Sequence, residues 1–96
     1  AMSRAFVNED GPGPDPSLRF RLPPRDDPGF LEAAARALLQ GANDGDSDAA
    51  EAATGYIFGE PKLVPYVQQL LVAARLSGND RQEQLAERFL ILVWTR

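Results

Sequence analysis

The residues best placed to do chemistry are two acids, Asp80 and Glu83, in the last third of the chain. They lie three positions apart, so on a helix they share one face. Two adjacent carboxylates can hold a magnesium ion whose other positions are filled by water and phosphate oxygens. They can also cap the helix, because negative charge stabilises its first turn. The spacing favours capping and leaves magnesium-dependent catalysis as the alternative.

Other constellations that support catalysis are missing or weak in this sequence. It contains no cysteine and no histidine, which removes thiol nucleophiles, disulfides, most zinc sites and the usual general base. Residues 42–46 alternate acids, amide and glycine, but the spacing and the distal glutamate of a calcium loop are wrong. Gly11 and Gly13 are separated by proline and follow no strand, unlike a phosphate loop. We therefore expect a non-enzymatic protein with no metal and no cofactor.

The formal net charge of −4 is spread unevenly along the chain. Residues 30–60 hold one arginine against six acids, whereas residues 61–96 hold five basic residues against three acids. Overall acidity disfavours nucleic-acid binding, which needs a basic footprint. Salt bridging and solubility account for Arg75, Arg81 and Arg88 more simply than nucleic-acid contact does. The acidic middle is interpreted as a solvated face, with a docking surface for a basic partner as the alternative.

The two acids follow a turn between two amphipathic stretches within residues 61–96. The first stretch has the apolar spacing of one helix face. Pro65 lacks an N–H group, so it belongs in the first turn of a helix that begins near Val64. Gly78 suits the left-handed position that ends such a helix. The apolar residues of this first helix are Leu63, Val64, Val67, Leu70, Leu71, Ala74 and Leu76.

A second helix is predicted to start directly after this turn. Asn79 can cap it, with Gln82 as the reciprocal partner three residues later. Asp80 and Glu83 then lie at its positive end. Because the connection is so short, the two helices are predicted to be antiparallel neighbours.

The end of this second helix, residues 89–94, is apolar all round. A surface helix needs only one apolar stripe, so this segment should be covered on several sides. A final strand is the alternative, since four of the six residues are β-branched or aromatic. The unbroken amphipathic pattern before it favours the helix. We therefore predict a homodimer, with an interface formed by Phe89, Leu90, Leu92, Val93 and Trp94 together with Tyr56 and Phe58.

Two further helices are predicted before the hairpin. Asp27 caps the first, Pro28 takes its first position and Gly41 ends it. Its buried face comprises Phe30, Leu31, Ala34, Ala35, Leu38 and Leu39.

The next helix is capped by Ser47 or Asp48, with Glu51 completing a capping box. Two ends are compatible with the sequence, at Gly55 or at Phe58, and we prefer the second.

The proline-rich and glycine-rich residues 1–26 are predicted to be an irregular arm, because repeated prolines favour extended, unpaired backbone. Alternating apolar residues leave a short strand over 17–22 as an alternative. The arm is either a disordered leader or a segment that packs across the body or onto a second subunit. The remaining residues, 27–96, then form one domain, and the fold class is a small all-α domain of four helices ending in an antiparallel hairpin.

The hairpin resembles the tip region of the bacterial Gre transcript-cleavage factors. Residues 74–84 read Ala-Arg-Leu-Ser-Gly-Asn-Asp-Arg-Gln-Glu-Gln, and that family has an Ala-Arg, Gly-Asp-x-x-Glu-Asn and aromatic pattern around the tip of an antiparallel helical hairpin. Residues 2–7 are also similar to the start of some Gre-like proteins. Asn79 is an extra residue before Asp80, and Gln84 stands where the family has asparagine.

The resemblance implies a function in transcription. In the Gre family the hairpin enters the secondary channel of RNA polymerase, and the tip acids help to hold a magnesium ion for RNA cleavage. Carried over by position, Asp80 and Glu83 would be those acids, and RNA polymerase would be the partner.

The leading expectation is a non-enzymatic helical interaction module that self-associates and binds a protein of the transcription or DNA-repair machinery. A Gre-like accessory factor and a nucleic-acid-binding protein are the alternatives. No stretch reaches the 18 apolar residues of a membrane span, and no basic-then-apolar signal start is visible. We therefore expect a cytoplasmic protein without a membrane partner.

Overall fold

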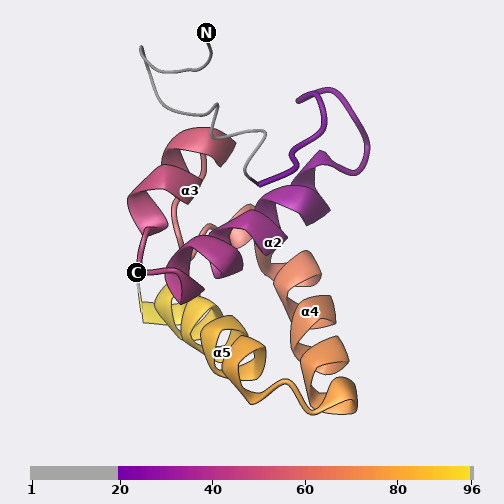
Figure 1. The fold of residues 1–96 in the computed structure, drawn as a ribbon, viewed down its shortest axis with the longest axis vertical. Helices are drawn as coiled ribbons and strands as arrows, with labels where there is room; N and C mark the ends of the chain where they lie inside the picture. The colour runs from indigo at the N-terminus through magenta and orange to yellow at the C-terminus, as the bar shows by residue number, and fades with distance from the viewer. Residues whose placement is uncertain (1–19, 96) are drawn as a thin grey trace, which may run out of the picture.

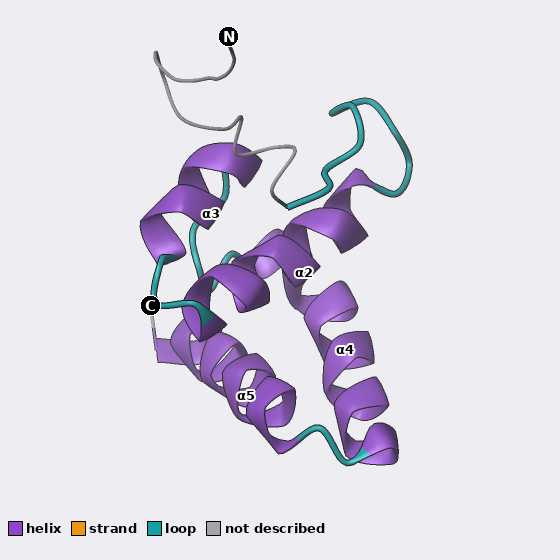
Figure 2. Ribbon diagram, in the orientation of Figure 1, coloured by secondary structure: helices purple, strands orange, loops and turns teal. Residues whose placement is uncertain are grey.

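The computed structural model describes residues 20–95, which form an all-α fold without a strand (Figures 1 and 2). None of its helices is long and apolar enough to cross a membrane. The prediction of a four-helix domain ending in an antiparallel hairpin is confirmed. The elements are α2 (Phe30–Asn43), α3 (Ser47–Thr54), the 3₁₀ turn η2 (Pro61–Leu63), α4 (Val64–Ser77) and α5 (Asp80–Thr95).

Most of the predicted arm, residues 1–19, lies outside the described part of the chain. Phe20 and Arg21 lie in a turn, so the alternative of a strand over 17–22 is wrong for these two residues. Phe20 is buried and Leu22 packs against the core. This end of the predicted arm therefore packs on the helical domain.

Helix α2 is the element around which the others pack. It contacts α3, α4, α5 and η2, and it crosses the hairpin in Figure 1. At 3.6 residues per turn, its buried residues cover roughly 200° of the helix circumference. The polar residues Glu32, Arg36, Gln40 and Asn43 lie on the exposed side. The buried residues of α2 are Phe30, Ala34, Ala35, Ala37, Leu38, Leu39 and Gly41.

The start of α2 differs from the prediction by two residues. Asp27 does not cap the helix. Its Oδ1 accepts a hydrogen bond from the Gly29 N–H at 2.7 Å, and its carbonyl accepts one from the Phe30 N–H at 3.0 Å. These bonds close a tight turn that contains Pro28, and α2 begins only after it. The side chain therefore stabilises the turn before the helix, which is the competing local use of an aspartate.

Gly41 does not end α2, because the helix continues to Asn43. Gly41 is buried where α3 crosses α2. A Cβ atom added at this position would lie 2.6 Å from the Cβ of Ala50 and 3.1 Å from the carbonyl oxygen of Asp46. The glycine is therefore used for close approach between two helices and not for a left-handed backbone.

Helix α3 ends at Thr54, and the preferred prediction of an end at Phe58 is wrong. Gly55 takes the left-handed conformation with φ 76°, which stops the helix. Asp46 is the residue before α3, and no side-chain bond caps the helix. The predicted capping box is wrong because Glu51 has another partner. Its Oε2 accepts a hydrogen bond from the Phe58 N–H at 2.9 Å and so holds the following loop.

Arg25 fixes the segment before α2 to the end of α3. Both terminal nitrogens of its guanidinium donate to the Thr54 carbonyl, each at 2.9 Å. The same group lies 4.9 Å from the ring centre of Phe30, within cation–π distance. A cation at the carboxyl end of a helix is favourable. Glycine is favoured at position 55 by its φ of 76°, and a Cβ added there would also displace this guanidinium.

The core of the domain joins α2 to the hairpin. Phe89 of α5 is fully buried, and its ring meets that of Phe58 edge to face with centroids 4.9 Å apart. Leu38, Leu63 and Val67 are also fully buried. Residues 89–94 belong to α5, so the alternative of a final strand is wrong.

Gly41→Ala tests the close approach of α2 and α3. We expect overpacking to cost about 1–3 kcal/mol, which outweighs the helix propensity of about 1 kcal/mol that alanine adds. The free energy of unfolding, measured by urea titration with circular dichroism, should therefore fall. The double variant Gly41→Ala with Ala50→Gly should show favourable coupling, because it removes the closest contact. A stabilised Gly41→Ala protein would contradict this packing.

Candidate functional site

The hairpin tip is built as the sequence predicts. Gly78 is left-handed with φ 73°, and the Asn79 N–H donates to the Ala74 carbonyl at 2.9 Å. The Oδ1 of Asn79 accepts a hydrogen bond from the Gln82 N–H at 3.1 Å, which confirms the predicted cap. The reciprocal bond of a capping box is not formed. The Gln82 amide instead donates to the Leu70 carbonyl at 3.2 Å and joins α5 to α4.

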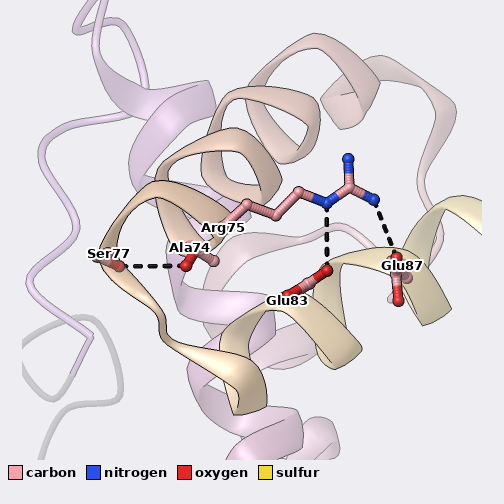
Figure 3. A network of polar contacts seen from close by, with 5 residues as sticks. All are labelled: Ala74, Arg75, Ser77, Glu83 and Glu87. Atoms are coloured by element: carbon pink, nitrogen blue, oxygen red, sulfur yellow. Dashed lines mark hydrogen bonds and ion pairs between the residues drawn. The ribbon is translucent and has the colours of Figure 1, made fainter.

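Glu83 is held by an ion pair across the hairpin (Figure 3). The Arg75 Nε lies 3.2 Å from a Glu83 oxygen, and an Arg75 terminal nitrogen lies 3.1 Å from a Glu87 oxygen. These bonds, that to Glu83 first, raise the pKa of Arg75 above its usual value. Arg75 therefore stays charged at any working pH and neutralises much of the negative charge at this point.

The tip acids have the geometry of a helix start. Asp80 is exposed in the first turn of α5, where its charge complements the helix dipole. Glu83 shares that turn, but its carboxylate is bound to Arg75. Within residues 20–95, no group of three metal-ligating side chains could hold an ion. The positions of both acids are those of residues at the start of a helix.

The predicted interface residues divide into a buried and an exposed set. Phe89 is 0% exposed and Phe58 is buried against it, so both belong to the core of a single chain. Tyr56 packs against Phe30 with ring centroids 6.5 Å apart. Trp94, in contrast, is 84% exposed. The remaining predicted residues, Leu90, Leu92 and Val93, are partly buried against the core.

The ion pair identifies a face of the hairpin that α2 does not cover. Arg75, Glu83 and Glu87 all contribute to this face, and each remains partly exposed. Residues three or four positions away on a helix lie on the same side. Leu71 and Val72 therefore continue this face on α4.

Leu90 and Trp94 continue the same face on α5 by the same spacing, and Ile91 flanks Trp94. Together with Leu71 and Val72 of α4, these three residues form a surface that we call the back patch. Val72 is 54% exposed and Ile91 60% exposed, whereas Leu71 and Leu90 are half-buried. The back patch comprises Leu71, Val72, Leu90, Ile91 and Trp94.

Sequence reasoning missed Val72 and Ile91 as surface residues. The signal was present, because α4 carries apolar residues on two opposite sides. Val67 and Ala74 face the core, whereas Val72 lies on the other side of the helix. One apolar face is enough to pack a helix on its own domain, so a second apolar face remains exposed.

Comparison with protein-family models, curated proteins and solved structures finds no significant match to this chain. A function therefore has to be inferred from its own residues.

Asn79→Ala tests whether the tip is a structural cap. Losing the bond to the Gln82 N–H should lower the free energy of unfolding by about 1 kcal/mol. Asn79→Asp is the matched control, because its carboxylate can accept the same bond. Thermal and urea unfolding followed by circular dichroism distinguish the two variants. Equal stability of Asn79→Ala and the wild type would show that the bond contributes nothing.

Proposed function

We propose that this chain is a non-enzymatic helical protein-interaction module that self-associates through the back patch. The observation that carries this proposal is the exposure of Trp94, at 84%, and of Ile91, at 60%, which lie three positions apart on one face of α5. A large aromatic side chain buries about 150–250 Å² when it is covered. Exposed apolar groups that gather on one face are typical of interaction sites.

In the proposed dimer, a two-fold axis passes through the back patch. It places the apolar residues of one chain on those of the other. Arg75 and its partner Glu83 then lie outside the apolar centre, at the rim. This is the usual arrangement of a homodimer, in which the same patch contributes from both chains and a polar rim surrounds it.

The size of the patch sets the expected strength. A standard interface uses about 20–30 residues and 800 Å² per partner. The back patch has five apolar residues, and two of them are already half-buried. We therefore expect a weak, reversible dimer with a dissociation constant in the micromolar range.

Trp94→Asp should abolish self-association, because it places a charge at the centre of the apolar contact. Ile57→Asp is the matched control. Ile57 is an exposed apolar residue of the loop after α3, outside the hairpin and the back patch. Sedimentation equilibrium over a range of concentrations should give a dimer for the wild type and for Ile57→Asp, and a monomer for Trp94→Asp. Phe89→Asp is unsuitable, because that side chain belongs to the core.

Fluorescence supplies a second measurement on the same proteins. Trp94 is the only tryptophan in the sequence. Its emission should shift to shorter wavelength and become less accessible to iodide as the wild-type concentration rises. A wild-type protein that stays monomeric, or an equal loss of dimer in Ile57→Asp, would contradict the proposed interface.

We propose as a second candidate the RNA polymerase accessory role that the Gre resemblance implies. Its support is the position of the tip, at the end of the molecule opposite α3, where Asp80 is exposed (Figure 1). Asp80→Asn should then abolish magnesium-dependent RNA cleavage by stalled polymerase, whereas Asp48→Asn, an exposed acid on α3, should not. Wild-type cleavage by Asp80→Asn would restrict Asp80 to its role at the start of α5.

A further inference from the structure

A cleft opens on the other side of the hairpin, between the second half of α2, α4 and the start of α5. Its volume is about 520 Å³, which lies within the roughly 300–1,000 Å³ of ligand pockets. The floor is apolar and the rim is polar. The floor is formed by Leu39, Leu70, Ala73 and Leu85, and the rim by Arg36, Gln40, Asn43, Asn79, Arg81 and Gln82.

The charge of the cleft is opposite to that of the chain. Two arginines and no acidic side chain line it, although the sequence has 14 acids against 10 basic residues. Arg36 is paired with Glu32 at 2.9 Å, which leaves its other nitrogens at the rim. The Nε of Arg81 donates to the Asn43 Oδ1 at 2.9 Å. This bond orients the guanidinium, whose terminal nitrogens have no hydrogen-bond partner within residues 20–95.

We propose that the cleft binds a segment of a partner protein that presents one apolar side chain with a carboxylate beside it. The leucines of the floor are almost fully buried and Ala73 is exposed, so the accessible apolar area of the cleft is small. An area of this size suits one side chain and not a broad surface. A guanidinium held in a fixed plane matches a carboxylate with two parallel hydrogen bonds. This site is separate from the back patch and does not depend on dimer formation.

A protein segment fits the cleft better than a nucleic acid does. Binding to a phosphate backbone uses many basic residues, and the chain is acidic overall. Bases are usually held by stacking on aromatic rings. No aromatic side chain lines the cleft. Two arginines above an apolar floor suit a single acid next to a single apolar side chain.

The test is selection of a random dodecapeptide display library on the full chain at low salt. We expect enriched peptides to carry aspartate or glutamate within two positions of a large apolar residue. A synthetic peptide with an enriched sequence should bind Arg81→Gln at least about tenfold more weakly than the wild type. Arg88→Gln is the matched control, because Arg88 is an exposed arginine of α5 outside the cleft and its loss changes the net charge equally. Binding to Arg88→Gln should be unchanged.

A charge reversal at Arg81 tests the charge preference of the cleft, which would not change if Arg81 had only a structural role. Arg81→Glu should shift the selected peptides from acidic to basic residues beside the apolar one. Failure to enrich any peptide, enrichment without acids, or equal binding by Arg81→Gln would overturn the proposal. The proposal would also be overturned if the wild type bound a single-stranded oligonucleotide, the peptide did not compete with it, and Arg81→Gln abolished that binding. The monomeric Trp94→Asp protein should still bind the peptide, which separates this site from the proposed dimer.

Discussion

The close packing of small residues along α2 is the constraint on which the rest of the structure depends. Ala34, Ala35 and Ala37 are buried with almost no exposed area, and Gly41 lets α3 approach within contact of α2. A helix whose buried residues cover more than half of its circumference, several of them small, can be packed on several sides at once. This is why α2 lies against α3, α4, α5 and η2 and why one face of the hairpin is left uncovered.

The parts of the fold that the sequence predicted correctly are those set by local chemistry. Pro65, Gly78 and Asn79 act within a few residues of themselves, and each has its expected role. One error is local, because Asp27 closes the turn before α2 instead of capping the helix. The other errors concern residues whose role depends on a more distant partner. Gly41 is required because Ala50 of α3 packs against it, and this contact forms only when α3 folds back onto α2. Glu51 likewise bonds the Phe58 N–H beyond the end of α3, and Gln82 bonds the Leu70 carbonyl of the neighbouring helix.

The candidate site divides in the same way. The all-round apolar character of residues 89–94 predicted cover on several sides. Within the chain only Phe89 is fully covered, whereas Ile91 and Trp94 are exposed. Phe58 reaches Phe89 because the loop after α3 is held by Glu51. Periodicity alone could not separate this internal cover from a second subunit, since both bury the same atoms. Trp94 and Ile91 are the residues of this segment that the chain itself leaves exposed.

The hairpin therefore has two faces with different chemistry. One carries the ion pair of Arg75 and the exposed Trp94, and the other carries Arg81 and the cleft beneath α2. Both faces draw on α5, and its helical turn places these residues on opposite sides. A chain dimerised through the back patch would still present its cleft to solvent. Two copies of the cleft in one dimer would then engage two segments of a partner, and the effective concentration of the second segment would raise a weak individual affinity.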